Sequence, residues 1–184
     1  MKTLETERLV LREWSGDDAE GLYFYGKSSK VGPMAGWKPH ESKEESEQIL
    51  QMFIKEGDCW AICLKDSGKI IGSAGLHRDA KRDVKNVRML GYVLAEEYWG
   101  QGLMPEACIE ILRFAFEELK LDLVSVYHYS FNAQSRRVIE KLGFRHEGVL
   151  RHATKRFDGA VLDEVCYSMT RDEFQQSQRT ENLS

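Results

Sequence analysis

The residues best suited to chemistry form a Gly-x-Gly turn, Gly100-Gln101-Gly102, which follows an apolar run and leads directly into an amphipathic segment. The first N–H groups of a helix lack intrahelical partners, and the aligned peptide dipoles make that end about half a charge positive. No Ser, Thr, Asp or Asn lies between Trp99 and Met104 to cap these donors, and the two glycines leave room for a ligand to touch backbone. The turn therefore predicts a phosphate-binding site.

The elements that must position this turn follow from hydrophobic periodicity and turn residues. Alternating patterns predict strands at 6–14, 60–64, 69–76, 87–94 and 124–129, and a final hairpin of 145–156 with 161–169. Helical spacing predicts helices at 18–25 and 42–57, a third after the glycine turn, and a fourth at 132–142, with an irregular segment at 28–40. The helix after the turn carries one apolar stripe, formed by Cys108, Ile111, Leu112, Ala115, Phe116 and Leu119.

These elements predict a mixed sheet in a single domain. Turn residues 66–68 and 158–159 are typical of hairpins, which pair antiparallel strands. The strand, helix and strand between residues 87 and 129 favour a parallel pair with a crossover helix on one face. We expect one domain over residues 1–174, followed by a flexible C-terminal tail at 175–184.

Composition narrows the class of protein. The 184 residues carry a formal charge of −4, which argues against nonspecific nucleic-acid binding. The longest apolar runs fall short of the roughly 20 residues of a membrane span, and the N-terminus lacks an apolar signal core. The four cysteines show no C-x-x-C spacing and no nearby histidine grouping, so we interpret them as reduced thiols in a cytoplasmic protein without a metal site.

Three segments together resemble the GNAT N-acetyltransferases. They are Gly91-Tyr92-Val93-Leu94, Tyr98-Trp99-Gly100-Gln101-Gly102, and Asn132-x-x-Ser135 continuing through Val138-Ile139-Glu140-Lys141-Leu142-Gly143-Phe144. The opening Glu5-Thr6-Glu7-Arg8-Leu9-Val10-Leu11-Arg12 and the Trp37-Lys38-Pro39 segment resemble the branch with ribosomal-protein-alanine acetyltransferases of the RimJ and RimL type. The resemblance implies an α+β fold with a mostly antiparallel twisted sheet of about six to seven strands, a parallel central pair and helices on both faces.

The resemblance also implies acetyl-CoA as co-substrate. Its pyrophosphate would bind the amides of Gly100, Gln101, Gly102, Leu103 and Met104, and its pantetheine arm would run along the strand that ends at Val93 and Leu94. Asn132 would contact the pantetheine region, while Ser135 would hydrogen-bond the CoA sulfur and protonate the departing thiolate. The residue types equally allow structural roles, Asn132 as a helix cap and Ser135 in the first helical turn.

Two positions depart from the family pattern. Trp99 stands where relatives often have Arg or Lys before the first glycine, so backbone would carry more of the phosphate binding, with Arg136, Arg137 or Lys141 as substitutes. Met89 stands where many relatives place a Glu that is a common candidate for the base.

The sequence leaves the base open. His77, at the end of a predicted strand, has an ordinary pKa near neutrality and is one candidate. Glu96, Glu97, Asp163 and Glu164 are alternatives acting through water, and water or a backbone carbonyl could suffice. No cysteine has an evident histidine partner, so direct transfer is favoured over a covalent cysteine route.

The expected activity is acetyl transfer to a primary amine. A protein N-terminal amine, such as that of a ribosomal protein, is the first hypothesis for the acceptor. A small amine such as a polyamine or an antibiotic is a second, and a non-catalytic acyl-CoA-binding regulatory module is a third, suggested by Trp99 and Met89. Since many relatives are dimers, a homodimer stays open.

Overall fold

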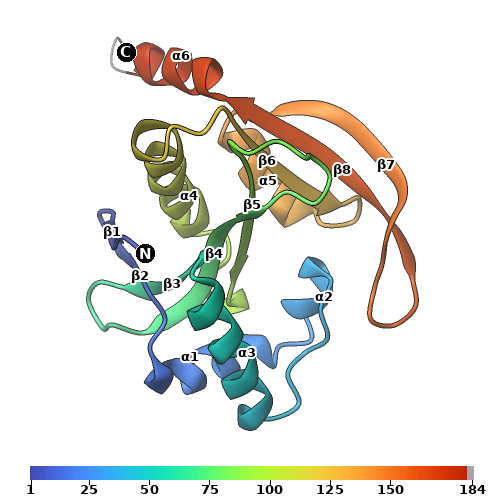
Figure 1. Ribbon diagram of the computed structural model, residues 1–184. Coiled ribbons are helices and arrows are strands. Elements are labelled where there is room, and N and C mark those ends of the chain that lie inside the picture. Colours follow the sequence, from blue (N-terminus) through green and yellow to red (C-terminus); the bar gives the residue numbers. More distant parts are fainter. Residues whose placement is uncertain (182–184) are drawn as a thin grey trace.

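The computed structural model describes residues 1–181 of the chain, shown as a ribbon in Figure 1. Its strands are β1 (Leu4–Glu5), β2 (Leu9–Arg12), β3 (Cys59–Leu64), β4 (Ile70–Arg78), β5 (Val87–Leu94), β6 (Leu123–Tyr129), β7 (Arg145–Lys155) and β8 (Val161–Thr170). Its helices are α1 (Ala19–Gly26), α2 (Gly32–Ala35), α3 (Lys43–Glu56), α4 (Leu103–Arg113), α5 (Ala133–Lys141) and α6 (Arg171–Glu181). Shorter helical turns are η1 (Gly16–Asp18), η2 (Glu96–Tyr98) and the π-helical η3 (Phe114–Glu118).

The strands form a single sheet in the order β1-β2-β3-β4-β5-β6-β8-β7. Every neighbouring pair is antiparallel except β5 and β6, so the predicted mixed sheet is confirmed. The sheet has 8 strands rather than six or seven. The additional strand is β1, which precedes the predicted strand at 6–14 and is separated from β2 by a turn in which the Leu9 N–H donates to the Thr6 hydroxyl at 3.0 Å.

Helices cover both faces of the sheet, as expected. On one face, α4 and α5 bury apolar side chains against the central strands, including Ala107, Cys108, Ile111, Leu112 and Ile139. On the other face, α1 and α3 pack through Leu22, Tyr25 and Leu50. Helix α3 begins as the sequence predicts, because the Ser42 hydroxyl accepts the Glu45 N–H at 3.2 Å.

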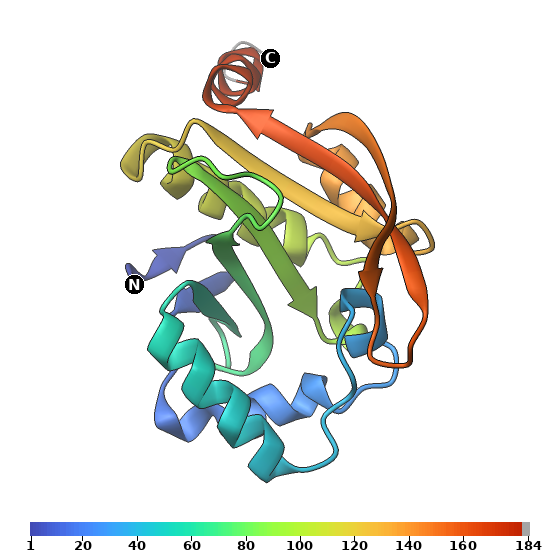
Figure 2. The same cartoon turned by 45° about the vertical axis from the view of Figure 1, so that its right-hand side comes forward.

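The parallel strands β5 and β6 separate soon after they pair. Their register joins Val87 to Leu123, Arg88 to Val124 and Met89 to Ser125, although β5 continues to Leu94 and β6 to Tyr129. Figure 2 shows the two strands, green and gold, diverging toward α2. Backbone groups along the separated edges therefore lack a neighbouring strand, and the divergence opens the sheet at its centre.

The irregular segment predicted at 28–40 contains the four-residue helix α2. Gly36 ends this helix with φ of +95°, and a Cβ there would collide with the Tyr129 hydroxyl. Glycine is therefore needed both for the left-handed backbone and for the close approach of α2 to β6.

One detail differs from the sequence-based expectations. Leu119, placed on the buried stripe after the glycine turn, is 48% exposed, because the π-helical η3 changes the periodicity before it. Helix α6 occupies residues 171–181 and so includes residues 175–181 of the expected tail, whose flexibility stays a prediction. Phe174 is buried with its ring centroid 5.1 Å from that of Phe116, which holds the helix to the domain. Residues 182–184 of the expected tail lie outside the described part of the chain.

Candidate active site

The glycine turn presents unpaired backbone donors, as the sequence predicts. Gly100 and Gly102 have φ of +75° and +77°, a backbone conformation that favours glycine. Gly102 precedes α4 without a side-chain cap. Within residues 1–181, no protein group accepts a hydrogen bond from the N–H groups of residues 100–104. These N–H groups, at the positive end of the α4 dipole, are therefore available to an anion.

Trp99 has a structural role that the sequence did not reveal. Its indole Nε1 donates to the Leu94 carbonyl at 2.7 Å, which ties the end of β5 to the start of the glycine turn. Arg8 supports the same turn from outside, donating to the Gln101 carbonyl at 3.1 Å. The Gln101 side chain donates to the Glu97 carbonyl at 2.8 Å. Hydrogen bonds from Trp99, Arg8 and Gln101 thus hold the turn to β5, to the segment before β2 and to η2.

A cavity of about 480 Å³ extends from the glycine turn through the opening between β5 and β6. Its lining includes every residue expected to contact the cofactor except Gln101, namely Val93, Leu94, Gly100, Gly102, Leu103, Met104, Asn132 and Ser135. Arg137 and Lys141 also line it, whereas Arg136 pairs with Glu140 at 2.8 Å. The structure therefore brings the glycine turn at 100–102 and the start of α5, with Asn132 and Ser135, to one cavity.

Asn132 acts as a helix cap at the start of α5. Its side-chain oxygen accepts the Ser135 N–H at 3.0 Å, and its side-chain nitrogen donates to the Met34 carbonyl of α2 at 3.0 Å. The structural role foreseen for Asn132 is present, and the residue also connects α5 to α2.

Ser135 forms a hydroxyl pair with Tyr92. The two oxygens lie 2.9 Å apart, and both residues line the cavity. Burial raises the pKa of the Tyr92 phenol, and the nearby Cys108 adds to this effect, while the hydrogen bond with Ser135 opposes it. Tyr92 therefore stays a neutral hydroxyl that can exchange hydrogen bonds with Ser135. The sequence places Tyr92 in a strand segment but does not reveal this pairing.

His77 does not line the cavity. It is paired in register with Met89, which does line it, but its Nδ1 lies 2.8 Å from Asp58 and its ring packs over Gly75 and Gly91. His77 therefore has a structural partner on the strand surface, and the geometry lends no support to its use as the base.

The alternative carboxylates divide into two groups. Glu96 pairs with Lys30 at 2.6 Å, Glu97 lies 3.8 Å from Lys69, and Asp163 accepts the His152 N–H at 2.8 Å, all outside the cavity. Glu164 alone of the four lines it, and Glu164 is only 7% exposed.

His128 is a cavity residue that sequence reasoning missed. It is 6% exposed, and its Nδ1 lies 2.8 Å from the Tyr129 carbonyl. In the described part of the chain, nothing hydrogen-bonds its Nε2. Its position in an apolar and aromatic strand gave no signal in the sequence.

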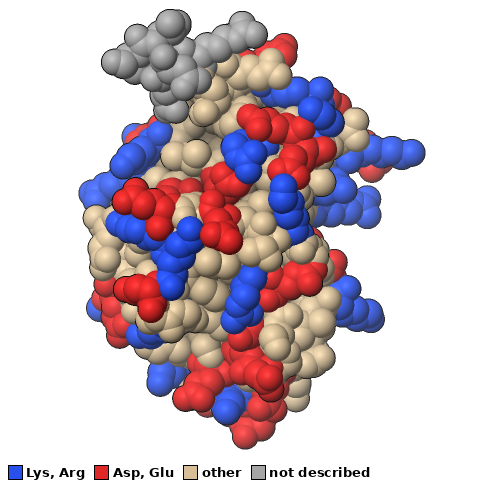
Figure 3. Space-filling model, turned by 90° about the vertical axis from the view of Figure 1, so that its left-hand side faces the viewer, with Lys and Arg blue, Asp and Glu red and all other residues tan. Residues whose placement is uncertain are grey.

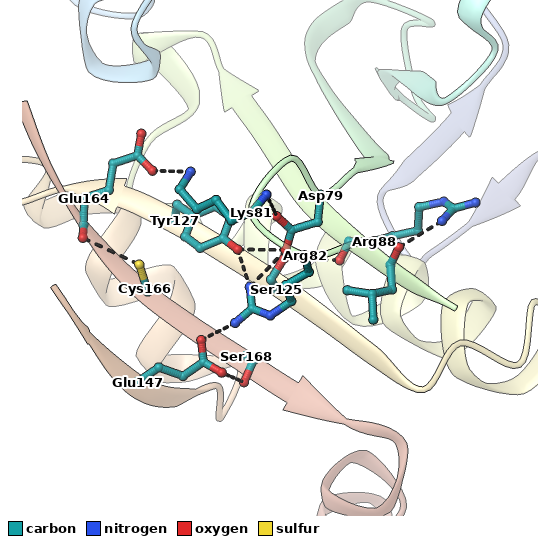
Figure 4. A network of polar contacts seen from close by, with 11 residues as sticks. Asp79, Lys81, Arg82, Arg88, Ser125, Tyr127, Glu147, Glu164, Cys166 and Ser168 are labelled. Carbon is teal, nitrogen blue, oxygen red and sulfur yellow. Dashed lines mark hydrogen bonds and ion pairs between the residues drawn. The ribbon is translucent and has the colours of Figure 1, made fainter. Parts of the chain in front are cut away.

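A buried polar cluster stands where β5 and β6 begin to separate (Figure 4). Asp79, 2% exposed, accepts hydrogen bonds from Ser125 at 2.6 Å, Tyr127 at 2.7 Å, Arg82 at 2.9 Å and the Lys81 N–H at 2.8 Å. Burial alone would raise the pKa of Asp79, but these four donors hold it below its ordinary value. The cluster fixes the connection after β4 against β6.

The cysteine thiols are poorly suited to act as nucleophiles. The four cysteines are buried and unpaired, and burial raises the pKa of each thiol, that of Cys59 to about 12. Thiols of this kind are poor nucleophiles.

Over residues 1–181, no three His, Cys, Asp or Glu side chains group as metal ligands, and no helix is long and apolar enough to cross a membrane. Acidic and basic side chains are interspersed on the face in Figure 3.

Known proteins share both the sequence pattern and the fold. Residues 8–145 match the family model described as an acetyltransferase (GNAT) domain. The chain is 30% identical over 173 residues to the uncharacterized N-acetyltransferase YoaA of Bacillus subtilis, covering 91% of this chain and 96% of that one.

Two solved structures illustrate the likeness of fold. The GNAT-family acetyltransferase from Bacillus anthracis has a TM-score of 0.83 at 22% identity, over 94% of this chain and 100% of that one. The ribosomal-protein-S5-alanine acetyltransferase from Vibrio fischeri has a TM-score of 0.76 at 24% identity, over 95% of this chain and 99% of that one. At these identities the likeness concerns the fold alone.

Proposed function

Since the chain belongs to the GNAT family of N-acetyltransferases, we propose that it transfers the acetyl group of acetyl-CoA directly to a primary amine, specifically the N-terminal amine of a protein. The family assignment makes the chain an enzyme and disfavours a non-catalytic acyl-CoA-binding module. GNAT acetyltransferases use acetyl-CoA. The residues that bind it here, and the acceptor, are parts of the proposal.

The observation that carries the proposal is the continuity of the cavity with the uncapped glycine turn. The unpaired N–H groups of residues 100–104 suit the pyrophosphate of CoA, and Arg137 and Lys141 add positive charge nearby. The separated edge of β5 near Val93 and Leu94 offers backbone groups to the pantetheine amides. The residues present thus fit CoA without the cation that Trp99 replaces.

The same cavity suits the departure of the thiol. Acetyl-CoA supplies an activated thioester, so the protein must orient the amine and provide a proton for the leaving sulfur. The Ser135 hydroxyl donates that proton, and the neutral Tyr92 hydroxyl, 2.9 Å away, supports Ser135 by hydrogen bonding. The neutral amine nitrogen forms the new bond to the acetyl carbon as the carbon–sulfur bond breaks. The nitrogen then loses one proton to water, and Ser135 regains a proton from water.

The acceptor side is bounded by α2 and by the strands beyond the opening. Met34 and Ala35 of α2 line the same cavity as Tyr129 of β6 and Glu164 of β8. The Vibrio fischeri neighbour is named for the alanine of ribosomal protein S5. The name of that neighbour supports a protein N-terminus as the acceptor proposed here.

The test is acetyl transfer to matched peptides. The purified chain is incubated with acetyl-CoA and peptides that begin with alanine or serine, with the same peptides blocked at the N-terminus, and with a polyamine. Release of free thiol and a mass gain on the unblocked peptides alone are expected. Transfer only to the polyamine would overturn the acceptor assignment, and thiol release no faster than hydrolysis with every amine would overturn the activity.

A further inference from the structure

The connection after β4 places one primary ammonium group in the cavity. Asp79 accepts the Lys81 N–H at 2.8 Å and is itself held by Ser125 and Tyr127 of β6. This anchoring fixes the Lys81 backbone beside β6, and its side chain extends along the Tyr127 ring to β8 (Figure 4). Lys81 therefore lines the cavity.

The surroundings of the Lys81 ammonium are those of a primary-ammonium binding site. Lys81 Nζ lies 2.6 Å from Glu164 Oε2 and 4.1 Å from the centroid of the Tyr127 ring. The Glu164 side chain is 10% exposed and that of Lys81 31%. A desolvated carboxylate beside an aromatic face is a combination that attracts organic cations.

Glu164 keeps acceptor capacity despite this contact. Its Oε1 accepts a hydrogen bond from the Thr154 hydroxyl. Its Oε2 is close to Lys81 Nζ, yet it accepts no well-directed hydrogen bond from any residue of the described chain. An ionised carboxylate offers about four lone-pair sites, so a buried Glu164 with one directed bond is incompletely satisfied.

The position of Glu164 relates this site to the proposed acceptor side. In the antiparallel register of β6 and β8, Glu164 pairs with Tyr129, so both side chains project to the same face of the sheet. Tyr127, two residues before Tyr129, projects to that face as well. Ser135 of α5 and Tyr92 of β5, which are hydrogen-bonded to each other, line the same cavity. The ammonium site and the thiol end thus flank one opening.

We propose that Glu164 and the Tyr127 ring form the subsite for the ammonium group of the acceptor, and that Lys81 occupies this subsite until an acceptor displaces it. The inference rests on the proposed function in taking this end of the cavity as the acceptor side. It narrows the substrate class to alkyl primary amines that arrive as cations. The bound ammonium group must release one proton to water before its nitrogen attacks the acetyl carbon. Neutral hydroxyl compounds of the same size lack the charge that Glu164 recognises.

The test measures binding of n-propylammonium by calorimetry at pH 8, between the ordinary pKa values of a carboxylic acid and an alkylammonium. The proteins are the wild type, Lys81→Met, Glu164→Gln and Lys85→Met. Lys85 lies in the same connection and is exposed, and its side chain forms no hydrogen bond or ion pair with any residue of 1–181, so it controls for the loss of one positive charge. 1-Propanol serves as the neutral control ligand.

Lys81→Met is expected to bind n-propylammonium about tenfold more tightly than the wild type if Lys81 fills the subsite roughly nine-tenths of the time. Glu164→Gln is expected to lose binding, Lys85→Met to match the wild type, and 1-propanol to bind none of them. Equal binding by all four proteins, or binding by none, overturns the proposal.

A second measurement uses the wild type alone and does not depend on whether a variant folds. In NMR spectra of ¹⁵N-labelled lysine ammonium groups, the Lys81 resonance should shift on addition of n-propylammonium, while that of Lys85 stays in place. An unmoved Lys81 resonance contradicts displacement. CoA binding and thiol release are measured separately, so a failure of the acetyltransferase assignment is recognised even when the ammonium site binds as expected.

Discussion

Replacement of Gly100 by valine tests the phosphate site with a matched control in the same chain. Gly100 and Gly68 have φ of +75° and +68°, and a Cβ at either position would have no atom within 4 Å. Gly68 lies in the β3–β4 hairpin, away from the cavity. The two substitutions therefore impose similar backbone strain, and only the one at Gly100 places a side chain beside the unpaired amides.

The magnitudes separate the two effects. A non-glycine residue in the left-handed region costs about 1–2 kcal/mol of stability, equivalent to roughly 2–8 °C in Tm for a chain of this size. If valine at Gly100 prevents two amide hydrogen bonds to a charged phosphate, at about 1.5–3 kcal/mol each, CoA affinity falls roughly 10²- to 10⁴-fold. Gly68→Val should show the loss of Tm without the loss of affinity.

The assay is calorimetric titration of CoA into both variants and the wild type, combined with thermal unfolding. Gly102 is a less clear target, because a Cβ there would lie 3.6 Å from the Arg8 guanidinium and could disturb the brace of the turn. If Gly100→Val binds CoA as tightly as Gly68→Val, the phosphate does not bind at this turn and the assignment is refuted.

Three further outcomes are expected. Ser135→Ala should lower kcat about 10²-fold with unchanged CoA affinity, since its backbone N–H still bonds Asn132; an unchanged kcat measured by thiol release would exclude Ser135 as proton donor. Asn132→Ala should lower the free energy of unfolding in urea by about 0.5–2 kcal/mol and speed proteolysis within 31–40, whereas an unaltered cleavage rate would contradict the link to Met34. Asp79→Asn should destabilise the protein by about 3 kcal/mol at pH 7. Because the folded pKa of Asp79 is depressed below 3.8, that difference is present above this pH and shrinks as the pH falls below it, which chemical denaturation at several pH values would check.

Local signals predicted the unpaired amides of the glycine turn and the start of α5. The absence of a capping side chain before α4 and the glycines at 100 and 102 are read directly from sequence, and the structure shows the unpaired amides they imply. Asn132 followed by Ser135 likewise predicts a helix start, because capping depends on residues three apart. Even the parallel pair follows from the length of one crossover connection.

Contacts between distant strands were beyond sequence reasoning. Lys81 and Glu164 meet only because β8 is inserted between β6 and β7 in the sheet, an order that hydrophobic alternation does not specify. His77 was proposed from its ionisation range, but its orientation is decided by Asp58 and by the two glycines beneath its ring. The role of Trp99 depends on one hydrogen bond to the Leu94 carbonyl, which no pattern of residue types predicts.

The short pairing of β5 with β6 has a mechanical consequence. Three residue pairs join a half-sheet of β1 to β5 to a half-sheet of β6, β8 and β7. The seam between the halves is therefore narrow, and an extended molecule hydrogen-bonded along both edges would act as an added strand that fastens one half to the other. Ligand binding at such a seam raises the cost of opening the whole domain, so protection from hydrogen exchange should increase on both sides of it and not only at the contact residues. In the proposed site, the pantetheine arm of CoA would be that added strand.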